Sequence, residues 1–318
     1  MEKTKVKDKR ISLNFLGMLG ILLLSCIPLL RTYLPDAELI LYWNEKAFSL
    51  IGRRPGFLIW TAALLISQIL TLFSVYFMGS SFFDKDEDGE KKVLIATLLI
   101  MFAPSRFYMT FVKYDVSEIV LWILIPIVIG ALIKGSREKS VLFIFISVLS
   151  MMAAVPVFAF KYVYTVKFFS ENGYAFGQLF STLFFKDVKP GIGIPIILAA
   201  CTESGCIMAG YEKKDKKALV LFITAIVLTA MSLICFPWDV ICRMSDLFRK
   251  VILHFGSPAF FIGPASMCFA ILGAKGIVAL RKSKNDFISE WLGKIICVLA
   301  VLVWIFLCNE TIYYQYMI

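Results

Sequence analysis

The sequence is poor in the residues that soluble enzymes use for acid–base and metal chemistry. Only one of its 318 residues is histidine and 18% are charged, against about 25% in average soluble domains. None of the eight cysteines forms a Cys-x-x-Cys pair, which argues against a zinc site. A small-residue cleavage site is also missing after the first apolar run, so we interpret that run as a retained membrane span.

Apolar residues are abundant instead. Hydrophobic residues make up 59% of the chain and the mean hydropathy is +0.81, whereas soluble domains have about 45–50% apolar residues. The composition therefore indicates an integral membrane protein. The net charge of +10 comes from Lys and Arg in short connections between apolar runs, so we interpret it as a topology signal and expect no nucleic-acid partner.

Nine apolar runs lie near the roughly 20 residues that a helix needs to cross a bilayer. We predict an all-α, polytopic helical bundle of about nine transmembrane helices, which forms a single membrane domain over residues 1–318. The runs are 12–30, 56–78, 93–112, 118–133, 140–160, 191–210, 217–235, 257–280 and 291–308.

The connections between the runs predict the orientation. One set holds 18 Lys and Arg in 49 residues and the other holds 13 in 100. Because basic residues concentrate on the cytoplasmic side, we predict a cytoplasmic N-terminus, an extracytoplasmic C-terminus and a location in the cell membrane. The predicted cytoplasmic segments are 1–11, 79–92, 134–140, 211–217 and 281–290. The predicted outer segments are 31–55, 103–116, 161–190, 236–256 and 309–318.

The outer segments are longer and chemically richer, so we expect the working face on that side. In the loop 31–55, residues 37–51 have helical apolar spacing, typical of a helix in the membrane interface. Residues 240–254 predict a second such amphipathic helix. Asp36 and Glu38 precede or begin the first helix, where a helix-capping role for Asp36 is the simpler alternative.

A polar stretch, residues 103–126, lies between two apolar runs and is the strongest functional signal. It carries Arg106, Lys113 and Glu118. Ionisable groups near membrane depth are costly, so they usually face a cavity or one another. The alternative is an ordinary hairpin between two spans whose charges are simply solvated.

This stretch resembles a motif of bacterial YfhO-like polytopic proteins, which belong to the GT-C group of glycosyltransferases. The matching residues are Pro104, Arg106, Phe111, Lys113, Ser117, Glu118 and Pro126. The Phe236-Pro237-Trp238-Asp239 block and the segment 253–258 are similar to further family motifs, and the resemblance covers residues 93–280. Lys113 replaces the usual Arg, while Ile40 and Trp43 stand where the family has His and Arg.

The resemblance implies transfer of a sugar from a polyprenyl-phosphate carrier to a cell-envelope acceptor at the outer face, with inversion. It implies Asp36 as the general base, with Glu38 second. It places the carrier phosphate near the cations Arg106, Lys113 and Arg243, because cations stabilise the leaving phosphate. Glu118 and Asp239 belong to the same carrier site. Glu118 would orient Arg106 or Lys113 by pairing with it. No cofactor is required, and a divalent metal held by Asp36 and Asp239 remains open.

Two non-enzymatic interpretations compete with this one. A transporter of lipid or envelope components, or a subunit of one, would place ionisable groups in mid-span and often has internal repeats. We find no repeat between the two halves of the sequence. A member of the family that binds carrier lipid without catalysis fits the missing His and Arg of the first outer loop.

Overall fold

The computed structural model describes residues 2–29, 57–84, 86–112, 116–160, 162–181, 190–211 and 215–317. Over these ranges the regular structure is helical, and the only β-type contact is an isolated bridge between Tyr174 and Leu233. The predicted all-α class is therefore confirmed for the described part of the chain.

In the described part of the chain, nine helices of 15 residues or more build the bundle, and shorter helices connect them. The long helices are α1 (Glu2–Ser25), α3 (Phe57–Phe82), α4 (Glu87–Met101), α6 (Val116–Glu138), α7 (Val141–Phe160), α9 (Ile194–Met208), α10 (Lys216–Met231), α13 (Ile262–Ala279) and α14 (Gly293–Met317). The short helix α5 (Pro104–Phe107) and the π-helix η2 (Tyr108–Val112) follow α4. The other short helices are α8 (Val166–Glu171), η3 (Phe176–Phe180), α11 (Trp238–Met244), α12 (Asp246–Leu253), η4 (Pro258–Phe261), η5 (Leu280–Lys282) and η6 (Ile288–Leu292).

Each of the nine predicted apolar runs contains a helix. Among the described residues, five helical segments are long and apolar enough to cross a membrane, and a sixth qualifies if the bent pair Glu87–Met101 and Pro104–Val112 is one span. The other apolar helices are shorter: α9 has 15 residues, which is about 22 Å of helix. The structure thus supports a multi-pass helical membrane protein with five or six such spans.

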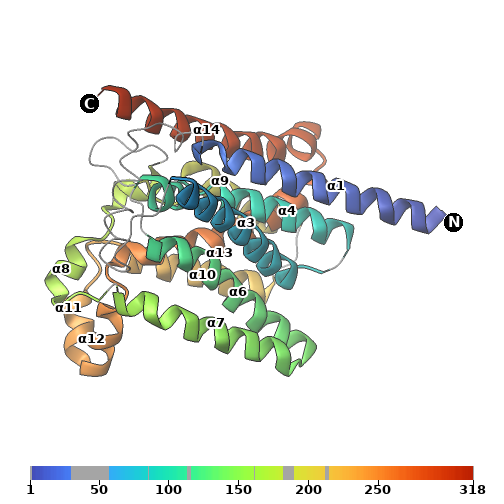
Figure 1. Cartoon of the computed structure of the whole chain (residues 1–318). Coiled ribbons are helices and arrows are strands. Elements are labelled where there is room, and N and C mark those ends of the chain that lie inside the picture. The colour runs from blue at the N-terminus through green and yellow to red at the C-terminus, as the bar shows by residue number, and fades with distance from the viewer. Residues whose placement is uncertain are drawn as a thin grey trace.

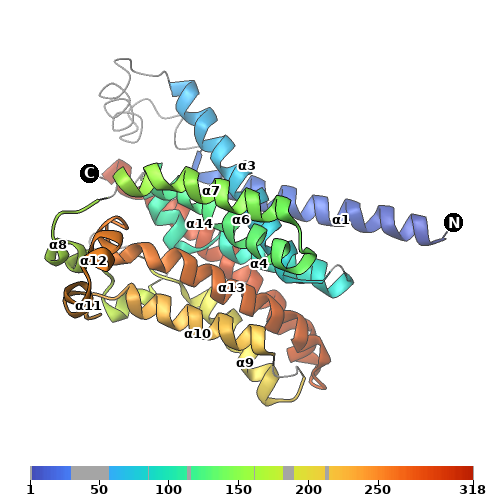
Figure 2. The ribbon, with the colours of Figure 1, turned by 90° about the horizontal axis from the view of Figure 1, so that it is seen from below.

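The connections between helices sort onto two opposite ends of the bundle. The N-terminus lies at one end, and the C-terminus lies at the other together with α8, α11 and α12 (Figures 1 and 2). At the N-terminal end Arg137 forms an ion pair with Asp84, and Ser283 Oγ lies 3.4 Å from Tyr211 Oη. These contacts join segments that the sequence predicts on the same side of the membrane. We call the opposite end, with α8, α11 and α12, the strap end.

Backbone hydrogen bonds hold the strap end together. Val163 N donates to Leu253 O at 3.0 Å, and Tyr174 N donates to Ser232 O at 2.8 Å. Ile192 N donates to Leu179 O at 3.0 Å. The predicted outer segments 161–190 and 236–256 therefore pack on each other. Such contact is consistent with both lying on the same side of a membrane.

Helix α13 is the centre of the bundle. Of its candidate span 78% is buried, against 11% for α7, which lies at the edge on α6. Small residues let α9 approach α13 closely: a Cβ on Gly276 would lie 2.3 Å from Glu203 N, and one on Gly273 would lie 2.5 Å from Ala199 Cβ. In a bilayer such close packing drives helix association, because burial of apolar side chains in lipid gains little.

The predicted span 93–112 is broken. Helix α4 ends at Met101, Ala103 has an extended backbone (φ −62°, ψ 127°), and Pro104 begins the next segment. The bend is 47°. Proline disfavours a helical conformation in the residue before it and supplies no N–H for the helix. The Pro104 motif position therefore acts here as a helix break.

Candidate functional site

Arg106 lies on the segment that follows this break, and its side chain points into the protein. It is 1% exposed. Its Nη1 donates to Met101 O at 2.5 Å, which satisfies a carbonyl at the C-terminal end of α4. Its Nη2 donates to Gln68 Oε1 of α3. The guanidinium thus ties the two halves of the broken span to each other and to a neighbouring helix.

An indole ring also faces the same guanidinium. Arg106 Cζ lies 5.7 Å from the ring of Trp304 on α14, and Phe107 meets that ring edge-on at 4.9 Å. A cation over a buried indole gains about 2 kcal/mol when both are desolvated. The alternative of solvated hairpin charges is therefore wrong for Arg106, whose described hydrogen bonds go to Met101 and Gln68.

Glu118 lies in the first turn of α6. It is 7% exposed, so the solvated-hairpin interpretation is wrong for it too. Its charge acts on Tyr174: burial raises the pKa of the Tyr174 hydroxyl, and Tyr108 and Glu118 raise it further. The same hydroxyl donates to Pro190 O at 3.2 Å. A buried tyrosine and a buried carboxylate thus share one region between α6 and the segment before η3.

The Phe236-Pro237-Trp238-Asp239 block anchors the strap end. Trp238 is 1% exposed and stacks on Phe261 with ring centroids 5.7 Å apart. Phe169 of α8 meets it edge-on at 5.3 Å. Each aromatic pair of this kind contributes about 0.5–1.5 kcal/mol beyond the burial of its area. The block is therefore an aromatic core that holds α8, α11 and η4 together.

Asp239 and Arg243 lie on α11 and are both exposed. The predicted amphipathic helix over 240–254 is wrong as a single element, because Ser245 separates α11 from α12. Its backbone is extended (φ −157°, ψ 127°) and its Oγ accepts a hydrogen bond from Phe248 N. Serine at this position satisfies a free N–H of the new helix, so the chain restarts there.

The apolar side chains expected on one face of that helix do not pack on the protein. They are exposed by 53% or more: Val240, Met244, Leu247, Phe248 and Val251. The inward face is formed by Cys242, Ile252 and Leu253, which are at most 4% exposed. The strap end therefore presents apolar side chains and cations to its surroundings together.

The structure places the predicted site residues in three separate environments. Arg106 contacts α3, α4 and α14, Glu118 lies near Tyr174, and Asp239 with Arg243 is on the exposed face of α11. The candidate bases Asp36 and Glu38 lie outside the described residues, as does Lys113. Within the described ranges no group of three or more His, Cys, Asp or Glu side chains could hold a metal ion.

The sequence interpretation missed an ion cluster inside the bundle. Lys275 Nζ of α13 lies 3.0 Å from Glu203 Oε1 of α9 and 3.5 Å from Asp215 Oδ2, the residue that caps α10. The Lys275 and Glu203 side chains are 14% and 4% exposed. The signal was present, because a Glu and a Lys each interrupt a predicted apolar run. The cluster extends from this buried pair to the predicted cytoplasmic connection 211–217, where the Asp215 side chain is 41% exposed.

These features define a class: an all-helical, multi-pass membrane protein with a broken span, a buried ion cluster and a strap of short helices at one end. Comparison with known proteins does not narrow this class further, since no protein-family model, curated protein or solved structure matches the chain. The similarity to YfhO-like proteins therefore rests on the motif residues alone.

Proposed function

We propose that the protein resides in the cell membrane with its strap end outside and its N-terminus in the cytoplasm. In this arrangement all nine predicted runs cross the bilayer, and α11 and α12 lie in the outer interface. Two observations support the proposal. The connections at the N-terminal end are the richer in Lys and Arg, as cytoplasmic connections are. The apolar face of α12 is exposed beside cations, as in helices that lie on a membrane surface.

We further propose that the strap end transfers a sugar from a polyprenyl-phosphate carrier to a cell-envelope acceptor. The observation that carries this proposal is the meeting of both motif segments at one end of the bundle. Gly193 lies against the Pro104 ring in a left-handed conformation (φ 87°), where an added Cβ would be 2.6 Å from Pro104 Cγ. From there Pro190 O accepts from the Tyr174 hydroxyl, and Tyr174 N bonds to Ser232 O, four residues before the Phe-Pro-Trp block.

Two buried polar groups on these segments support a ligand site there. Ser105 Oγ and Trp238 Nε1 have no hydrogen-bond partner among the described residues. A buried group left in this state costs about 1–3 kcal/mol, so each calls for a partner that the described residues do not supply.

In this proposal the site residues have different roles. Asp36, with Glu38 second, is the general base, and Arg243 is exposed where it can contact a phosphate from solvent. Asp239, one turn before Arg243 on α11, lies on the same exposed side. Arg106 is enclosed, so it acts by holding the broken span in shape; direct phosphate contact would require the bend to open. Glu118 and Lys113 belong to the same segment and complete the predicted carrier site.

A transport function is the second candidate, and the ion cluster Glu203–Lys275–Asp215 favours it. Ionisable groups buried between membrane helices usually mark substrate or ion pathways. A broken span next to a bundle core is also common in transporters. This candidate places the working groups in α9 and α13 rather than at the strap end.

Reconstitution of the full chain in liposomes with a radiolabelled polyprenyl-phosphate sugar tests both candidates. The transferase predicts carrier-dependent release of the sugar or its transfer to an added acceptor. Asp36→Asn should abolish this activity, and Asp246→Asn, an exposed carboxylate on α12, should leave it unchanged. Arg243→Gln should raise the apparent KM for the carrier several-fold, while Arg281→Gln at the opposite end should not.

The other outcomes are equally informative. Flux of labelled lipid or solute across the liposome without sugar release supports the transporter, and Glu203→Gln should then reduce it. Carrier binding without release or flux leaves a non-catalytic binding protein. Full transfer activity in Asp36→Asn would remove Asp36 from the mechanism.

A further inference from the structure

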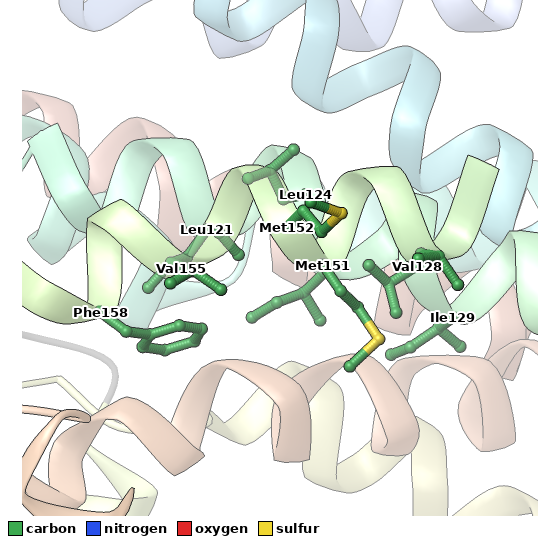
Figure 3. Close-up of a pocket in the computed structure, with 11 residues that line it drawn as sticks. Leu121, Leu124, Val128, Ile129, Met151, Met152, Val155 and Phe158 are labelled. Atoms are coloured by element: carbon green, nitrogen blue, oxygen red, sulfur yellow. The ribbon is translucent and has the colours of Figure 1, made fainter. Parts of the chain in front are cut away.

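An apolar groove runs between α6 and α7 on the outside of the bundle. Its volume is about 520 Å³, within the range of ligand pockets. Eleven apolar residues line it, from Leu121 to Ile129 on α6 and from Val148 to Phe158 on α7. Figure 3 shows these side chains converging from the two helices. Met151, Met152 and Val155 are 56–65% exposed, so the groove is open to its surroundings.

The length of the groove along the helices matches the thickness of one leaflet. The lining residues extend over nine positions of α6 and eleven of α7, which is about 12–15 Å from first to last at 1.5 Å per residue. A bilayer hydrocarbon core is about 30 Å thick, so one leaflet accounts for about half. Both helices are candidate spans, and most of the lining residues belong to their halves nearer the strap end. The dimensions therefore fit one extended acyl chain of the leaflet at that end.

Helix α12, which carries basic residues, lies next to one end of the groove. Phe158 lines the groove, and its ring lies 5.3 Å from Phe255. The preceding residue, His254, contacts Tyr162 with rings 4.7 Å apart and donates from Nδ1 to Lys250 O at 2.7 Å. Lys250 and its neighbour Arg249 are both exposed. The apolar groove thus ends beside the cations of α12.

We propose that this groove binds one acyl chain of an anionic phospholipid, with its phosphate held by Arg249 and Lys250. A wholly apolar groove with cations near one end complements a single acyl chain that carries a negative head. The bound lipid fills the space that α7 leaves beside α6 and joins α7 to α12. This site is separate from the sugar-transfer proposal and does not depend on it.

Photo-crosslinking tests the proposal on the purified full chain in nanodiscs of phosphatidylcholine. The probe is phosphatidylglycerol with a diazirine in one acyl chain, and crosslinked residues are mapped by peptide mass spectrometry. We expect crosslinks to concentrate on 121–129 and 148–158. Unlabelled phosphatidylglycerol should compete at least fivefold better than phosphatidylcholine.

Matched variants separate the groove from ordinary lipid contact. Val155→Trp fills the groove and should lower its crosslinking several-fold. Leu149→Trp, on α7 but outside the groove, should not. Arg249→Gln with Lys250→Gln should remove the preference for phosphatidylglycerol, whereas Lys216→Gln with Lys217→Gln at the other end should retain it. Gel filtration checks that each variant folds. If a variant does not fold, the competition between phosphatidylglycerol and phosphatidylcholine for the unmodified chain tests the proposal instead.

Three results would overturn the proposal. Crosslinks could spread evenly over the lipid-facing residues of α7 and α10, or the two phospholipids could compete equally. Polyprenyl phosphate could compete better than phosphatidylglycerol, which would assign the groove to a carrier lipid instead.

Discussion

At the scale of single residues, the buried charges separate into two kinds. The described partners of Arg106 carry no charge. They are a backbone carbonyl and a side-chain amide, which accept its hydrogen bonds, and an indole ring that it contacts. Lys275 instead lies between two carboxylates from different helices. A buried ion pair is costly to form and more costly to break, because removal of one partner leaves the other charge buried.

The geometry of this cluster predicts an order of stabilities. Lys275→Met should lower the free energy of unfolding by about 3 kcal/mol, because Glu203 and Asp215 then repel each other. Glu203→Gln should cost less, since Asp215 still pairs with Lys275. The double variant should be more stable than Lys275→Met alone. Thermal unfolding midpoints of the four proteins in one detergent would measure this, and additive losses would contradict the coupling.

At the scale of helices, α9 and α13 are held together by close backbone contact. Gly276 of α13 lies against Glu203 and Thr202 of α9, so the same contact also sets the position of the Lys275–Glu203 pair. A side chain inserted there meets backbone atoms, which cannot move aside without separating the helices. Packing of the two helices and placement of their charges are therefore linked.

A glycine pair tests this contact. Gly276→Ala puts a Cβ 2.3 Å from Glu203 N and Thr202 Oγ1, and overpacking of this kind costs about 1–3 kcal/mol. Gly205→Ala on α9 is the control, because no atom lies within 4 Å of its added Cβ. That variant should be neutral or more stable by up to about 1 kcal/mol from helix propensity. Unfolding midpoints compare the two, and an equal response would place the helices farther apart than described.

At the scale of the whole molecule, the two ends differ in chemistry. The strap end has aromatic cores, short capped helices and exposed apolar side chains, whereas the other end has plain basic turns. Such a difference is expected when the two ends face different compartments.

Cysteine labelling in sealed, right-side-out vesicles tests the orientation. Cys235, exposed in the turn before α11, should react with a membrane-impermeant maleimide, and Cys235→Ser should remove that label. In the Cys235→Ser background, Asp286→Cys at the opposite end should react only after detergent is added. The reverse pattern would invert the orientation and would place the strap end in the cytoplasm, which contradicts the proposed transferase.

The sequence alone determined the class and the order of the elements. Its apolar runs are long and are separated by polar connections, and helices must satisfy their own backbone hydrogen bonds in lipid, so helix positions follow from the local pattern. The pattern does not predict the break at Pro104, because residues 93–112 form one apolar run. The two-sided sorting of loops followed from counting basic residues.

Only the tertiary structure decided where the charges go. The local pattern of residues 103–126 does not say that Arg106 turns toward Gln68 and Trp304, which are 38 and 198 positions away in the sequence. Nor does it pair Lys275 with Glu203, because each is surrounded in sequence by apolar residues. A side chain's partner depends on which helices pack together, and in a bilayer this is set by close fit between small residues such as Gly273 and Gly276, a property of two helices at once.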